Sequence, residues 1–197
     1  EIFEEYRPLI VEAVEEEEEP PWPAYKKALA GALLLALLAA ARRRATQVQD
    51  DLQLYVDGDA LEAELLDWGR GYAEQRAGQL TRTTRDLVTQ ARLADDEAAF
   101  DQLLDRAFGQ RRRRDISWTE TTFAVSAGYL IAERLMQREH GVELTALWFT
   151  QEDERVCPVC APLHGTGRET WAEAFPTGPP AHPNCRCFLF PEAAVGP

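Results

Sequence analysis

The stretch from Cys157 to Pro191, CPVCAPLHGTGRETWAEAFPTGPPAHPNCRCFLFP, determines how the C-terminal part of this chain can fold. It opens with Cys-x-x-Cys, and His-Pro-Asn-Cys-Arg-Cys stands near its end. It contains all four cysteines of the chain: Cys157, Cys160, Cys185 and Cys187. Two close pairs of thiols, each on a turn rich in Pro, Gly or Asn, match the ligand pattern of a tetrahedral Zn²⁺ site. We therefore predict a structural zinc ion bound by these four residues.

The sequence leaves the exact ligand set open. The second pair is Cys-x-Cys, which is tighter than the usual two-residue gap, and His182 lies three residues before Cys185. His182 can therefore replace one of the thiolates, and the absence of any metal is the remaining alternative. A site with four protein ligands has no open coordination position, so its role would be structural and not catalytic.

Three charged residues lie close to the cysteines in the sequence. Asp153 and Arg155 are suited to hold a loop beside the metal through a charge-assisted hydrogen bond. Arg186 lies between Cys185 and Cys187, where its charge would offset that of two thiolates. The alternative interpretation is that all three are exposed surface.

Residues 142–197 have too little apolar content to fold alone. We expect strands at residues 144–150 and 188–190, a short helix or strand at residues 170–175, and a small core of Trp148 and Trp171. A segment of this size usually needs a metal, disulfides or a partner. A structural zinc contributes about 10–16 kcal/mol of apparent folding free energy, which is enough to order it.

Two enzymatic interpretations of the cysteines are disfavoured. Cys157-Pro158-Val159-Cys160 resembles the redox turn of glutaredoxins, but the residues that follow it are a poor helix start, and a helix N-terminus is what lowers the thiol pKa in those enzymes. Zinc deaminases need His-x-Glu and Pro-Cys-x-x-Cys, and neither motif is present. We therefore expect no enzymatic activity, and keep a thiol oxidoreductase as an alternative.

Helical periodicity dominates the rest of the chain, which predicts a mainly α fold. We divide it into an N-terminal helical docking arm (residues 1–57), a helical body (58–141) and a small C-terminal α+β module that resembles a zinc knuckle (142–197). The arm should contain a short helix at its start and a long one over residues 24–56. A turn at residues 57–59 should end the long helix.

Several boundary signals divide the helical body. Asp95 or Asp96 can cap a helix, and Gly109 is expected to adopt a left-handed conformation at its end. Ser117-Trp118-Thr119-Glu120 has the form of a capping box, which predicts a helix that starts there. His140-Gly141 should end that helix, with His140 bonded to its last carbonyl groups.

The apolar run of residues 28–41, ALAGALLLALLAAA, has 14 residues, whereas a spanning helix needs about 20. The acidic run Glu15–Glu19 before it is unlike the basic leader of a signal peptide. We therefore expect no membrane-spanning segment, no export, and a reducing compartment that favours metal over disulfides. The run should pack between helices or subunits, which indicates an oligomer or a docking surface. The chain begins at Glu1 without Met, which suggests a longer or processed product.

The charge of the chain argues against general coating of nucleic acid. Its net charge is −13 and its pI is about 4.7, whereas binding to phosphates requires a basic face. We interpret the basic runs Arg42–Arg44 and Arg111–Arg114 as solvated helix ends. The alternative is a zinc-dependent nucleic-acid-binding module in which Arg111–Arg114 and the Cys-Arg-Cys loop contact DNA.

A family resemblance rests on motifs over roughly residues 70–191. They are Trp118-Thr119-Glu120-Thr121, Gly128, Glu139-His140-Gly141-Val142, the run from Trp148 to Cys160, Leu163-His164-Gly165, and the ending Pro179-Pro180-Ala181-His182-Pro183-Asn184-Cys185-Arg186-Cys187. In these the chain resembles the phage Mu F-like head morphogenesis family, also called minor capsid or minor head proteins. Many members have His where Cys160 stands and often no Cys at position 157. A site built from His182, Cys185 and Cys187 therefore stays open.

The resemblance implies a structural component of a tailed phage or prophage. Such proteins are few in copy, lie inside the head beside the portal, and influence assembly and the fate of packaged DNA. The expected partners are the portal or other capsid proteins of the same virion, in an oligomeric assembly, with contact to packaged DNA as a further possibility. The expected location is the virion interior, and the host cytoplasm during assembly. The resemblance carries no catalytic residues.

Overall fold

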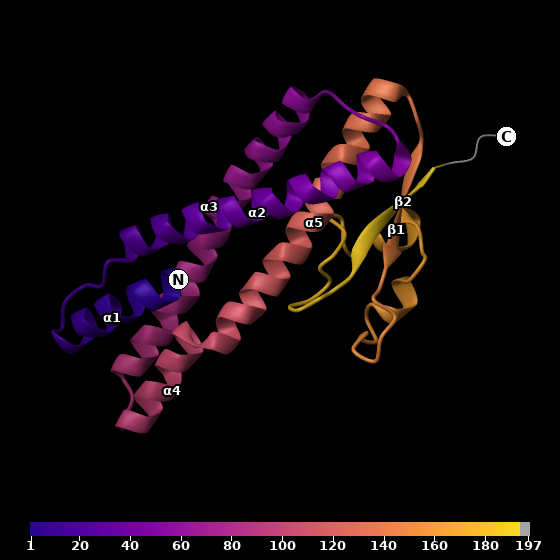
Figure 1. Cartoon of the computed structure of the whole chain (residues 1–197). Helices are drawn as coiled ribbons and strands as arrows, with labels where there is room; N and C mark the ends of the chain where they lie inside the picture. The colour runs from indigo at the N-terminus through magenta and orange to yellow at the C-terminus, as the bar shows by residue number, and fades with distance from the viewer. Residues whose placement is uncertain (194–197) are drawn as a thin grey trace. The chain divides into compact units, whose positions relative to one another are not determined.

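The computed structural model describes residues 1–193 and is mainly helical, with a small two-stranded sheet near the C-terminus (Figure 1). The helices are α1 (Ile2–Glu15), α2 (Trp22–Leu52), α3 (Gly58–Arg92), α4 (Glu97–Phe108), α5 (Gln110–His140) and the short α6 (Arg168–Trp171). The strands are β1 (Leu144–Phe149) and β2 (Phe188–Ala193), and a 3₁₀ turn, η1, covers Ala161–Leu163. The predicted fold class, mainly α with a small C-terminal α+β module, is confirmed.

The chain forms two compact units, and each unit uses two separate stretches of sequence. The first unit comprises residues 1–35 and 69–116, and the second comprises residues 36–68 together with the chain from residue 117 onward. Helices α2, α3 and α5 therefore each contribute one part to each unit. The three-part division by sequence stays a prediction about which stretches fold independently.

Aromatic rings form the core of the first unit. Tyr25 of α2 is fully buried, and its ring meets the edges of Phe3 of α1 and Phe108 of α4 at centroid distances of 6.2 and 6.4 Å. Its hydroxyl lies 3.4 Å from the Thr84 hydroxyl of α3. Edge-to-face aromatic pairs add to the burial of their area, so this one side chain joins four helices.

The second unit packs the sheet against α2 and α5. Strands β1 and β2 pair antiparallel with Trp148 opposite Leu189, and both of these side chains are fully buried. The guanidinium of Arg44 on α2 donates to the Leu189 carbonyl at 2.6 Å and lies over the Tyr129 ring of α5. Arg44 is therefore buried and links α2 to β2 through this hydrogen bond. The prediction that it belongs to a solvated helix end was wrong.

The helix ends show which boundary signals were correct. Asp96 caps α4, since its side chain accepts from the Ala99 N–H at 2.8 Å. Gly109 was predicted to be left-handed, but its φ is −66° and its backbone is extended. A side chain at this position would collide with Asp105, which explains why a glycine stands there.

The predicted capping box at residues 117–120 was wrong. Helix α5 begins at Gln110 and continues through Ser117, because the arginines after Gly109 are good helix formers and start the helix earlier. Gly141, with φ +65°, ends α5 as predicted. The His140 ring bonds the Tyr55 carbonyl at 2.7 Å instead of the last carbonyl groups of α5.

Helix α2 ends at Leu52, four residues earlier than predicted, and Asp57 starts α3 by accepting from the Ala60 N–H. By length and composition alone α2 can cross a membrane. Core helices of soluble proteins meet the same criterion, but they are mostly buried, whereas 28% of the apolar window of α2 is buried, Leu29 and Leu38 among it.

Gly128 permits α2 and α5 to cross closely within the second unit. A Cβ atom on Gly128 would overlap the Ala41 carbonyl and lie 2.8 Å from the Ala41 Cα, and both are backbone atoms that cannot rotate away. We predict that Gly128→Ala lowers the free energy of unfolding by about 1–3 kcal/mol, the usual cost of overpacking. Urea denaturation followed by circular dichroism measures it.

The matched control is Gly71→Ala in α3, where the added methyl group meets nothing within 4 Å. Replacing glycine by alanine inside a helix at an open position stabilises by about 0.5–1 kcal/mol. Equal stability of the two variants would contradict the close crossing.

Candidate metal centre

Two tight turns bring the four cysteines together. In the first, the N–H groups of Cys160 and Ala161 donate to the Cys157 carbonyl at 3.1 and 3.0 Å, and η1 follows directly. In the second, the Cys185 N–H donates to the His182 carbonyl at 3.2 Å, and Asn184 adopts a left-handed φ of +62°. Asparagine tolerates this conformation better than most residues. In the second turn, the asparagine that marked the segment as a turn therefore occupies the left-handed position.

The side chains of both turns converge. The His182 Nε2 atom lies 3.0 Å from the Cys157 Sγ and 3.3 Å from the Cys160 Sγ. The Sγ atoms of Cys160 and Cys185 are 3.8 Å apart. Two groups of three potential ligands result, Cys157–Cys160–His182 and Cys160–Cys185–Cys187, and within each group all donor atoms lie within 4.8 Å of one another. Cys160 belongs to both groups.

This donor set fits a zinc ion. All four cysteines are free thiols, and Cys160, Cys185 and Cys187 are buried. Thiolates on a tetrahedral zinc, with Zn–S bonds of ~2.3 Å, lie about 3.8 Å apart, as the Cys160 and Cys185 sulfurs do. The contacts of His182 are slightly shorter than the roughly 3.6 Å between coordinated sulfur and nitrogen. Soft sulfur donors with one imidazole favour zinc over magnesium or calcium.

The histidine is oriented for binding through Nε2. Its Nδ1 atom lies 2.8 Å from the Pro183 carbonyl, which can only accept a hydrogen bond. The proton therefore belongs on Nδ1, and the Nε2 lone pair faces the sulfurs of Cys157 and Cys160. Metal-bound histidines are commonly fixed in this way by a carbonyl on their other nitrogen.

The thiols differ in acidity. The Cys187 thiol donates to Cys185 and lowers the pKa of Cys185 to about 5. Burial, together with the charge of Cys185, raises the pKa of Cys160 to about 12. Burial opposes ionisation of Cys157, but hydrogen bonds from the Cys160 backbone and side chain outweigh it and lower its pKa. A metal must displace protons from the thiols that remain neutral, so its binding releases protons.

A bidentate ion pair closes the loop beside the cysteines. The two Arg186 Nη atoms lie 2.7 and 2.5 Å from the two Asp153 carboxylate oxygens. This pair holds the pKa of Asp153 at about 2, helped by the Arg155 N–H, which donates to the same carboxylate at 3.0 Å. Arg155 thus contributes its main chain, and the partner of Asp153 is Arg186.

Helix α5 supports the second turn directly. The buried hydroxyl of Thr122 donates to the Cys185 carbonyl at 2.7 Å, and the Thr119 hydroxyl accepts from the Asn184 N–H at 3.1 Å. Beneath the cysteines lie Trp148 and Trp171, 0% and 1% exposed, with ring centroids 5.9 Å apart. The two tryptophans form the small core that the sequence predicted. Neither threonine was predicted to support the site, because no local pattern marks a partner more than 60 residues away.

The remaining histidine of the module lies outside both ligand groups. His164 bonds the Thr150 hydroxyl at 2.9 Å through Nδ1 and belongs to neither group.

The basic run Arg111–Arg114 makes hydrogen bonds and ion pairs within the first unit. Arg112 is partly buried and donates to the Thr84 hydroxyl, while Arg113 pairs with Glu4. The interpretation of this whole run as solvated was therefore wrong for Arg112.

The contact between Thr122 and the Cys185 carbonyl can be tested by an isosteric change. We predict that Thr122→Val lowers the free energy of unfolding by about 1–2 kcal/mol, because it leaves a buried carbonyl without its donor. The control, Thr121→Val, changes the neighbouring exposed threonine and should alter stability by less than about 0.5 kcal/mol. Urea denaturation of both variants measures the difference in their free energies of unfolding. A Thr122→Val protein as stable as its control would show that the contact contributes nothing.

Comparison with known proteins places this arrangement in a family. Searches of curated proteins and of solved structures returned no significant match. A family model described as Phage Mu protein F like protein matches residues 90–190. The matched region contains α4, α5 and every potential ligand of both groups. It covers more than half of the chain, which agrees with the motifs in the sequence, and the chain therefore belongs to the phage Mu protein F-like family.

Proposed function

We propose that this protein is a minor head protein that acts beside the portal of a phage or prophage during head assembly, as a non-enzymatic component. Membership of the family implies a phage head morphogenesis protein, and members of the family are generally structural head proteins. The observation that carries the proposal is the extent of the match, which runs from α4 through α5 to the end of the cysteine-containing module.

We further propose that a structural zinc ion holds the C-terminal module. The candidate ligands are Cys157, Cys160, Cys185 and Cys187, with His182 as the alternative to one cysteine. Support comes from the convergence of their donor atoms, from the shared position of Cys160 and from the fixed orientation of His182. With four protein ligands the ion has no free position for a substrate. When bound, it would join the two turns, which the contacts of His182 with Cys157 and Cys160 and the Asp153–Arg186 ion pair also link.

The role of the module follows from its attachment to α5. Thr119 and Thr122 bind the second turn, and the buried Glu133 carboxylate pairs with Arg168 of α6 at 2.5 Å. Burial raises the pKa of Glu133, and the Arg168 charge opposes this shift. A module fixed at several points along one helix forms a rigid end on the second unit, which suits a structural component that docks onto an oligomer.

The alternative functions have less support. A DNA-binding role for Arg111–Arg114 would compete with the contacts that Arg112 and Arg113 already make. Arg186 in the Cys-Arg-Cys loop is paired with Asp153. A thiol oxidoreductase needs an activated thiol. The pKa of Cys157 is lowered, but only the short 3₁₀ turn η1 follows it, and its sulfur lies within a group of potential metal ligands. Both remain distinguishable by experiment.

Metal content tests the zinc site. We predict about one zinc per chain in protein purified without chelator, measured by mass spectrometry. Cys160→Ser should lose the metal, because Cys160 belongs to both ligand groups. The control is His164→Asn, which alters a histidine of the same module outside both groups and should retain the metal. Of His182→Asn and Cys187→Ser, only the change that removes a true ligand should release zinc. Absence of zinc from the parent chain would refute the site.

Association with the portal tests the head function. We predict that the chain, co-expressed with the portal protein of its own genome, purifies with the portal ring. The Cys160→Ser variant should bind less, since its module loses the metal that orders it. A well-folded, zinc-loaded chain that shows no affinity for the portal would contradict the proposed location while leaving the metal site intact. Retention on DNA that falls steeply with salt would favour the nucleic-acid alternative.

A further inference from the structure

The first unit contains a groove between α1 and α4 that the proposed function does not use. It has a volume of about 410 Å³, within the range of sites that bind ligands. Its lining comes from one face of each helix: Arg7, Pro8, Val11, Glu15, Glu97, Phe100, Asp101 and Leu104. All eight residues belong to the same unit of the chain, so the groove is complete within it.

The floor of the groove is apolar. Leu104 is 2% exposed, and Val11 and Phe100 are half-buried against the same core. Pro8 lies inside α1 and has no N–H, so the Glu4 carbonyl cannot receive its usual helical hydrogen bond. A partner with apolar side chains and a hydrogen-bond donor would therefore satisfy both features.

The rim of the groove carries an excess of negative charge. Glu15, Glu97 and Asp101 contribute three carboxylates, which we call the rim carboxylates, and Arg7 contributes one cation. All four side chains are exposed, and within residues 1–193 none of them takes part in an ion pair. A partner that brings lysine or arginine side chains to this rim would therefore gain ion pairs without breaking existing ones.

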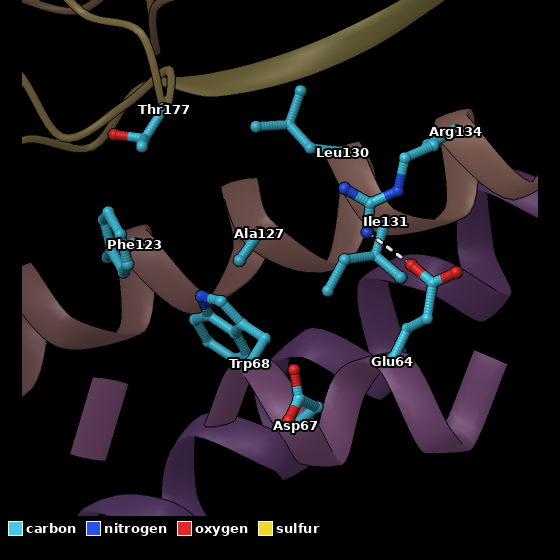
Figure 2. Close-up of a pocket in the computed structure, with 9 residues that line it drawn as sticks. All are labelled: Glu64, Asp67, Trp68, Phe123, Ala127, Leu130, Ile131, Arg134 and Thr177. Carbon is cyan, nitrogen blue, oxygen red and sulfur yellow. Dashed lines mark hydrogen bonds and ion pairs between the residues drawn. The ribbon is translucent and has the colours of Figure 1, made fainter. Parts of the chain in front are cut away.

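The second unit has a pocket of similar size, about 460 Å³, but its charge is balanced. Trp68 and Phe123 form its apolar part, with ring centroids 6.2 Å apart (Figure 2). Its carboxylate Glu64 already pairs with Arg134, drawn as a dashed line in Figure 2, and with Arg138. Charge therefore selects no partner for this pocket, whereas it selects a cationic one for the groove of the first unit.

We propose that the groove between α1 and α4 binds a basic amphipathic helix of a partner protein. The apolar face of that helix lies against Phe100 and Leu104, and its lysine or arginine side chains lie beside the rim carboxylates. Placing an apolar helix face in a groove is a common mode of recognition. The proposal rests on neither the head function nor the metal site, because it is derived from α1 and α4 alone.

Other occupants fit the charge of the groove less well. A second copy of this chain has a net charge of −13, and several of its arginines already have partners. Arg42 pairs with Glu62, and Arg112 and Arg113 bond within the first unit. Residues 194–197, outside the described part of the chain, include no basic side chain. The rim carboxylates would repel the phosphates of nucleic acid and of anionic lipids.

A labelled peptide tests the proposal on the full chain, by fluorescence anisotropy at 0.15 M salt. The probe is a helix of about 15 residues with leucines on one face and lysines on the other. We expect saturable binding. A peptide with glutamates in place of the lysines should not bind. A peptide with alanines in place of the leucines should bind at least about tenfold more weakly, because it loses the apolar contact.

Two variants that remove charge locate the site. Glu97→Gln/Asp101→Asn removes two rim carboxylates and should weaken binding about fivefold, the effect of two exposed ion pairs. The control, Asp67→Asn/Glu169→Gln, removes the same charge from the second unit, where Asp67 lines the pocket of Figure 2. It should leave the affinity unchanged. All four side chains are exposed, so circular dichroism should show unchanged folds.

Three results would overturn the proposal. The first is the absence of saturable binding. The second is a loss in the control that equals or exceeds the loss in the groove variant, which would mean attraction to the overall charge or binding at the other pocket. The third is self-association of the chain that excludes the peptide and that the groove variant abolishes, which would assign the groove to a second copy.

Discussion

The close crossing of α2 and α5 at Gly128 is the constraint on which the second unit depends. Only a residue without a side chain lets the α5 backbone approach the Ala41 carbonyl. At that separation, Arg44 of α2 reaches both Tyr129 of α5 and the Leu189 carbonyl of β2. The sheet therefore lies where two helices can bind it at once. A wider crossing would separate these partners and leave a guanidinium buried without its acceptor, which is costly.

The module that contains the four cysteines is attached to these helices. Its own core is small, with Trp148, Trp171 and Leu189 buried, and α5 supports it through contacts at Thr119, Thr122 and Glu133. The two turns then bring five potential metal ligands into one small volume. The family match covers the supporting helix and the ligands together. Support and cluster therefore lie together in the region that the family shares.

The sequence predicted what is encoded locally. Cys-x-x-Cys, the His-Pro-Asn-Cys-Arg-Cys turn and the Asp96 cap each act over a few residues, and each was found where it was predicted. The capping box at Ser117 failed because good helix formers upstream had already started α5. The roles of Arg44 and Thr122 were missed for another reason. Their partners lie 145 and 63 residues away in the sequence, and no local pattern of residues encodes a contact at that distance.

The interleaved use of the chain by its two units has a consequence during synthesis. The second unit starts at residue 36, yet Leu189, the acceptor for Arg44, is synthesised 145 residues after Arg44. Until then the C-terminal half of α2 has no sheet to cover it, and its apolar side chains stay exposed to water. Contacts between residues so far apart in sequence form slowly. The nascent chain therefore carries an uncovered apolar helix until the segment with Leu189 has been made, which makes it a natural client for a chaperone.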